Sequence, residues 1–140
     1  NQNIMPKSLT TANDTLDAFL RAVDPAWRAG ATRYIALHTA DPANAGTQST
    51  SEATYTGYAR VSVTAATGFS AGVAGSSANT ALIQFPQCTG GTNVITHVSI
   101  GTATTGAGQI IYRGALNASL SVANLIQPQF SIGSLTASEQ

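Results

Sequence analysis

Charged side chains are nearly missing from the second half of this 140-residue chain. Between Arg60 and Glu139 the only charged residue is Arg113, and charged residues make up 9% of the sequence, whereas about a quarter is typical. Six basic and six acidic residues cancel, so nothing in the charge favours nucleic acid or an anionic membrane as a partner. Uncharged small residues suit close packing against a neighbour, although a neutral monomer would have the same composition.

Cysteine is almost as scarce. The single Cys88 cannot form an internal disulfide and belongs to no zinc-binding spacing, so we expect a small buried hydrophobe. The alternative, a catalytic pair of Cys88 with His97, has no supporting motif. His38 and Asp41 would give a metal only two ligands, and Asp41 more simply caps the Asp-Pro turn with its own backbone.

Paired carboxylates for glycoside hydrolysis are also lacking, because five of the six acids precede residue 53 and lie mainly on a helix and a long loop. The sequence therefore predicts no catalytic residues, no cofactor and no metal, and hence a protein that is not an enzyme.

Long hydrophobic runs are absent too. The chain never reaches the roughly 18 consecutive apolar residues of a membrane span, and its first residues lack a signal-peptide pattern. We therefore expect a soluble, unsecreted product without a membrane partner.

One helix is indicated between Leu9 and Asp24. Thr10 or Thr11 could cap it, and Asp24 precedes a proline, which ends it. Its apolar residues fall on one stripe, and the opposite face is polar. With the tryptophan that follows, this stripe gives the candidate contacts to a neighbouring protein or to another copy: Leu16, Phe19, Leu20, Val23 and Trp27. The stripe could instead close an open end of the chain's own β-domain.

After Gly30 the periodicity changes to two, which indicates strands. The expected strands are 32–38, 58–64, 69–73, 80–85, 94–100, 109–116, 120–122 and 129–132. In 94–100 we expect Val94, Val98 and Ile100 to face one way, with Ile95 on the other face. The polar stretch 41–57 exceeds the usual loop length, so it is expected to be functional or mobile.

These elements predict a mainly β fold, a jelly-roll-like antiparallel β-sandwich with one N-terminal α-helix. We divide the chain into an N-terminal arm and helix, residues 1–28, and a β-sandwich domain, residues 29–140, within one structural domain.

Two segments resemble small virion proteins of tailed phages. The first, 33–42, reads R-Y-I-A-L-H-T-A-D-P, and after a polar loop 57–63 reads G-Y-A-R-V-S-V. Later residues are similar as well, namely I-Q-F-P at 83–86, T-H-V-S-I-G at 96–101, Gly106 and G-A-L at 114–116. The resemblance covers most of residues 33–135 and includes both capsid decoration (cement) proteins and tail-fibre-like proteins.

The resemblance implies a non-enzymatic structural protein of the virion, made in the bacterial host cytoplasm. Because fibrous repeats are absent, we favour a cement protein on the outer capsid surface, with the major capsid protein and itself, as a homodimer, as partners. The alternative is a tail- or fibre-associated protein that binds host-surface glycan through the loop 41–57.

Overall fold

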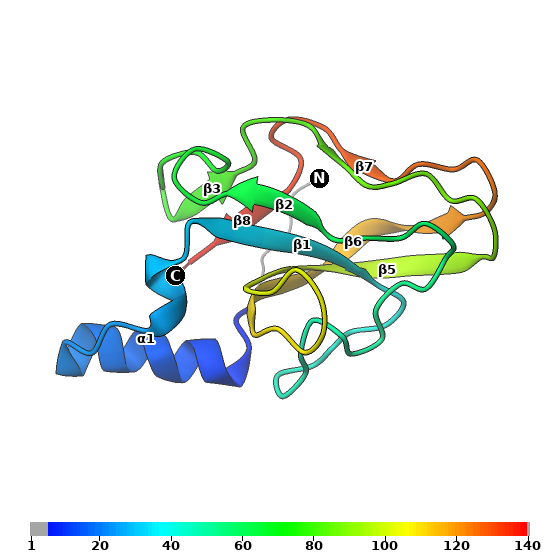
Figure 1. Ribbon diagram of the computed structural model, residues 1–140. Coiled ribbons are helices and arrows are strands. Elements are labelled where there is room, and N and C mark those ends of the chain that lie inside the picture. Colours follow the sequence, from blue (N-terminus) through cyan, green and yellow to red (C-terminus); the bar gives the residue numbers. More distant parts are fainter. Residues whose placement is uncertain (1–5, 140) are drawn as a thin grey trace.

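The computed structural model describes residues 6–139 and has the predicted class, mainly β with antiparallel sheets and an N-terminal helix (Figure 1). The helical elements are α1 (Leu9–Arg21) and the short 3-10 helix η1 (Ala26–Ala29). The strands are β1 (Thr32–His38), β2 (Val61–Thr64), β3 (Ser76–Ala78), β4 (Ile83–Gln84), β5 (Asn93–Gly101), β6 (Ile110–Val122), β7 (Gln129–Phe130) and β8 (Thr136–Ser138).

A four-stranded sheet in the order β2-β1-β5-β6 forms the main layer of the described residues. Its neighbours are antiparallel, with Ile35 opposite Val61 on one side and opposite Ile100 on the other. Two short antiparallel pairs, β3 with β8 and β4 with β7, lie over it and give a sandwich-like arrangement.

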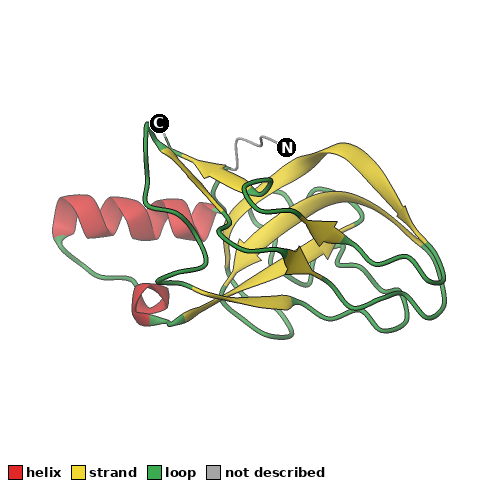
Figure 2. Cartoon of the chain, turned by 90° about the horizontal axis from the view of Figure 1, so that it is seen from above, coloured by secondary structure: helices red, strands yellow, loops and turns green. Residues whose placement is uncertain are grey.

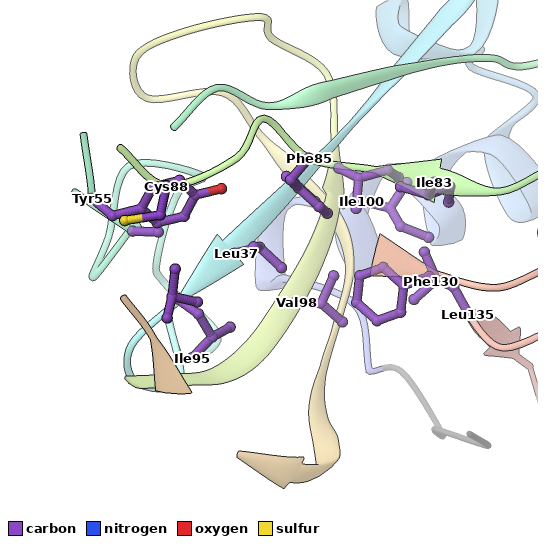
Figure 3. Packing of buried hydrophobic residues seen from close by; sticks show 13 residues of the cluster. Leu37, Tyr55, Ile83, Phe85, Cys88, Ile95, Val98, Ile100, Phe130 and Leu135 are labelled. Atoms are coloured by element: carbon purple, nitrogen blue, oxygen red, sulfur yellow. The ribbon is translucent and has the colours of Figure 1, made fainter. Parts of the chain in front are cut away.

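The core lies between these layers (Figure 3). Leu37, Val98 and Ile100 from the main sheet pack with Phe85, which directly follows β4, and with Phe130 of β7, and all are buried. Every member of this core cluster comes after residue 34. The sandwich therefore has its own apolar core and takes none of it from α1.

The strand predictions are partly correct. Residues 32–38 form a strand as expected, and the two expected strands 109–116 and 120–122 are one continuous strand, β6. Residues 69–73 make only isolated bridges, whereas Ser76–Ala78, outside the expected strands, form β3.

The predicted faces of β5 are wrong at Val94 and Ile95. Ile95 is fully buried in the same core cluster as Val98, while Val94 is 52% exposed. The difference coincides with a register shift in the pairing with β6, between Ile95 and His97.

The helix begins and ends differently from the prediction. Ser8, not Thr10 or Thr11, is the N-cap, and its Oγ accepts a hydrogen bond from the Thr11 amide. The last helical residue is Arg21, because Ala22 adopts a left-handed conformation that closes the helix before Pro25. Figure 2 shows α1 running outward from the strands.

Candidate functional surfaces

The apolar stripe of α1 faces solvent. Phe19 is 82% exposed and Leu20 79% exposed, and Leu9, Leu16 and Val23 are each exposed by about half. Leu9, Leu16 and Phe19 lie with Leu20 on one face of α1, whereas Val23 lies just beyond its last residue. Within residues 6–139 the stripe does not close the end of the sandwich. An amphipathic helix ordinarily buries this face.

The opposite, polar face of α1 makes the contact with the sandwich. The hydroxyls of Ser8 and Thr11 both donate to the carbonyl oxygen of Ile110, at 2.6 and 2.7 Å, where β6 begins. The side-chain Nε2 of Gln109 donates to Thr11 Oγ1 and to Asp14 Oδ2, at 2.8 and 2.9 Å. This set of hydrogen bonds fixes the orientation of the helix and so holds the apolar stripe outward.

Trp27 lies apart from the stripe, on η1. Its Nε1 donates to Asp14 Oδ2 at 2.8 Å, and its ring lies 5.9 Å from the guanidinium carbon of Arg33. Trp27 lines a groove of about 350 Å³ between α1, η1 and β6, which Phe19 and Ile111 also line. The groove thus adjoins the stripe at Phe19.

A second candidate surface is the loop 41–57, which is tied to the sandwich by a nearly buried ion pair. Arg60 has a side chain only 2% exposed, and its Nε and Nη2 donate to the two carboxylate oxygens of Glu52, at 2.7 and 2.9 Å. Arg60 also donates to the carbonyls of Ala103 and Gly106. The Tyr58 hydroxyl donates to Glu52 Oε1 and accepts from the Leu37 amide. These groups are used in holding loops together.

Gln48 is the innermost polar residue of the same loop and is fully buried. Its Nε2 donates to the Tyr34 carbonyl at 3.0 Å, and its Oε1 accepts from the Ala103 amide at 3.0 Å. A Cβ on Gly101 or Gly108 would come within 2.1 or 2.4 Å of the Gln48 side chain, so these glycines make room for it. The middle of the loop is consequently hydrogen-bonded into the sandwich through Gln48.

His38 and Asp41 also connect the loop 41–57 to the sandwich by hydrogen bonds. His38 is fully buried, with Nδ1 2.8 Å from the Thr50 carbonyl and Nε2 2.8 Å from Ser99 Oγ. Burial lowers the pKa of His38 below its ordinary value. Asp41 Oδ1 accepts from the Ala43 amide at 2.9 Å, as the turn prediction required, and pairs with Arg113.

Cys88 is buried, as predicted, and its thiol donates to the Gly90 carbonyl at 3.2 Å. His97 is hydrogen-bonded to the hydroxyl of its neighbour Thr96. Among residues 6–139, no group of three or more His, Cys, Asp or Glu side chains is placed to hold a metal ion. In the same range, no helix is long and apolar enough to cross a membrane.

Comparison with protein families gives one match that spans nearly the whole described chain. The family is described as "Podophage GP4 fiber I protein gp80", and the match covers residues 6–138. The chain belongs to this fibre I family. No curated protein matches it. Membership supports a phage virion structural protein of fibre type, in agreement with the resemblance seen in the sequence at that coarser level.

Sequence reasoning found the apolar stripe but missed the polar network under the loop of this fibre I protein. Glu52, Arg60 and Gln48 interact across chain separations that no local pattern reports. The signal that could have found them is the scarcity of charge itself. In a chain with few ionisable groups, a basic residue inside an alternating strand favours a buried partner.

Proposed function

We propose that this protein is a structural subunit of a phage tail fibre, which acts by assembly and binding and catalyses no reaction. The family match over residues 6–138 is the observation on which the proposal rests. It changes the preference derived from the sequence, where the cement role came first because fibrous repeats were lacking.

The chemistry of the polar side chains supports a non-catalytic role. The buried groups that could act as base or nucleophile, His38 and Cys88, are hydrogen-bonded to backbone carbonyls and, for His38, also to Ser99. Burial also raises the pKa of Tyr55 to about 12, and its hydroxyl donates to the Pro86 carbonyl. Each group stabilises a loop, which is what a rigid structural module requires.

Location on the particle is the decisive test. Antigen-binding fragments raised against the purified protein would be added to intact virions and imaged by electron cryomicroscopy, with peptide quantification giving the copy number. We expect labels at the tail and a copy number far below that of the major capsid protein. Labels spread over the outer capsid surface in hundreds of copies would assign the cement role instead.

Host-surface glycan binding through the loop 41–57 stays a prediction. The structure bears on it in one respect, because a loop fixed by Gln48 and Glu52 offers a rigid surface and loses little conformational entropy on binding. Glycan-array binding that disappears when exposed Ser49 and Thr54 are changed to bulky residues would support it.

A further inference from the structure

The outward stripe of α1 has no partner inside the described chain and is not explained by a fibre role alone. We propose that α1 is a contact between copies of this protein, in which the stripe packs against the stripe of a second copy. The stripe is defined here as Leu9, Leu16, Phe19, Leu20 and Val23. The inference goes beyond the proposed function and is independent of where the subunit lies on the particle.

The first argument is the orientation of the helix. A helix of 13 residues is marginal on its own in water, so its stability depends on packing. Here the packed face is polar, and the hydrogen bonds from Ser8 and Thr11 to Ile110 point the apolar face away from the sandwich. Such hydrogen bonds stabilise the helix only modestly, and burial of the apolar stripe would supply the remaining stabilisation.

The second argument is area. If a fully exposed side chain of this kind offers roughly 150–200 Å², the five residues present on the order of 500 Å² per copy, against about 800 Å² per partner in a standard interface. The stripe alone thus supplies more than half of the area that each partner buries in a standard interface. The groove beside it, lined by Trp27 and Ile111, enlarges the surface and lies next to the protruding Phe19. A protrusion and a recess on one patch suit a self-complementary contact.

The third argument is charge, which selects a second copy over other partners. Residues 7–28 contain three basic and three acidic side chains: Lys7, Arg21, Arg28, Asp14, Asp17 and Asp24. Asp17 and Arg21 lie together beside the stripe, paired at 3.0 Å. In an antiparallel pair of helices centred on Phe19, Asp17 of each copy would approach Arg21 of the other. A strongly charged partner would gain nothing from this balanced surface.

Sedimentation equilibrium of the full chain at about 50 μM is the primary test, in the range where a micromolar contact is occupied. We expect the wild type to exceed the 14.2 kDa of one chain. The double variant Phe19→Glu, Leu20→Glu should weaken association by at least ~100-fold, because it buries repelling charges at the contact. Both side chains are exposed, so its circular dichroism should show an intact fold.

The matched control is Val73→Glu with Ile132→Glu, which adds the same charge at side chains that are 73% and 69% exposed elsewhere. This control should associate like the wild type. A wild type that is monomeric, a Phe19→Glu, Leu20→Glu variant that still associates, or a control that dissociates equally would each overturn the proposal. A monomer that binds a different virion protein through the stripe would also overturn it.

A cross-link gives a readout that does not depend on folding energy. Because Cys88 is fully buried, Phe19→Cys provides one accessible thiol, at the position where the two helices of the proposed antiparallel pair cross. Mild oxidation should join two copies within minutes, while Ile132→Cys should remain uncoupled under the same conditions. Equal coupling of the two variants would contradict a contact through α1.

Discussion

At the scale of single residues, a few buried polar side chains of this protein hold its loops and strands together. Arg60 is the strongest case, because one guanidinium holds Glu52 and two loop carbonyls while almost wholly buried. His38 is the second, since both ring nitrogens are hydrogen-bonded between β1, the loop 41–57 and β5. Residues of this kind are expected to affect stability far more than their number suggests.

Arg60→Ala should be among the most destabilising single changes. It leaves the Glu52 carboxylate without its partner, and breaking a buried pair costs about 3–5 kcal/mol. Arg28→Ala is the control, because the pair of Arg28 with Asp24 is mostly exposed and its loss should cost less than about 1 kcal/mol. Urea unfolding followed by far-ultraviolet circular dichroism, which reports the strands of the sandwich, measures both. Equal losses would show that the Arg60 pair is not a structural tie.

His38 should make stability depend on pH. Burial lowers the folded-state pKa below the ordinary 6.5, so the unfolded chain binds the proton more readily. The stabilisation is complete above pH 6.5 and is lost as the pH falls toward the folded-state pKa. We expect the free energy of unfolding to decrease between pH 7 and pH 5 in the wild type. In His38→Gln this decrease should be smaller, and an unchanged decrease would assign it to other groups.

At the scale of elements, α1 is attached to the sandwich by a small set of polar contacts in its first two turns. Thr11 is buried and bonded to both Ile110 and Gln109, whereas its neighbour Thr10 is exposed. The remaining two turns point outward with the stripe. The helix should therefore open locally at a lower free energy than the core strands.

Thr11→Val tests this attachment, because it removes the hydroxyl and keeps the shape. Losing the bonds to Ile110 and Gln109 should cost about 1–3 kcal/mol and speed amide hydrogen exchange in α1 by roughly tenfold or more. Thr10→Val, at an exposed position one residue away, should change exchange little. If both variants exchange like the wild type, the helix is held by something other than this hydroxyl.

The elements that could be predicted are those with a strong local period. The helical spacing of Leu16, Phe19 and Leu20 and the strand around Ile35 and Leu37 are visible in the sequence, and the structure has a helix and a strand there. Val23, expected on the helix, lies beyond its end. The irregularity after Ile95 leaves no local signal, so the faces of β5 were assigned wrongly there. The burial of Gln48 beneath two glycines depends on chain segments that only the fold brings together.

At the scale of the whole molecule, the chain combines a self-contained sandwich with an appended helix. The core begins at Ile35 and ends at Leu135, and its buried residues come from both sheet layers. The N-terminal segment adds hydrogen bonds, including one from the Arg113 amide to the Pro6 carbonyl, but no member of that core.

Deleting residues 1–28 should therefore leave a folded β-protein. We expect a cooperative thermal transition and a β-rich circular dichroism spectrum, because every core residue is retained. Sedimentation of the truncated chain should give a monomer if α1 is the contact between copies. Aggregation or a non-cooperative transition would mean that the helix completes the core after all.

The hydrogen bonds from Ser8 and Thr11 to Ile110 join positions 102 and 99 residues apart in sequence. Contacts of such long range form late, since the intervening chain must first be ordered. The Ile110 carbonyl to which α1 is bonded is in place only after β6 has paired with β5. The direction of the stripe is therefore fixed only once the sandwich has folded. Folding would then set the order of assembly, because a nascent or misfolded subunit cannot present its helix to a neighbour.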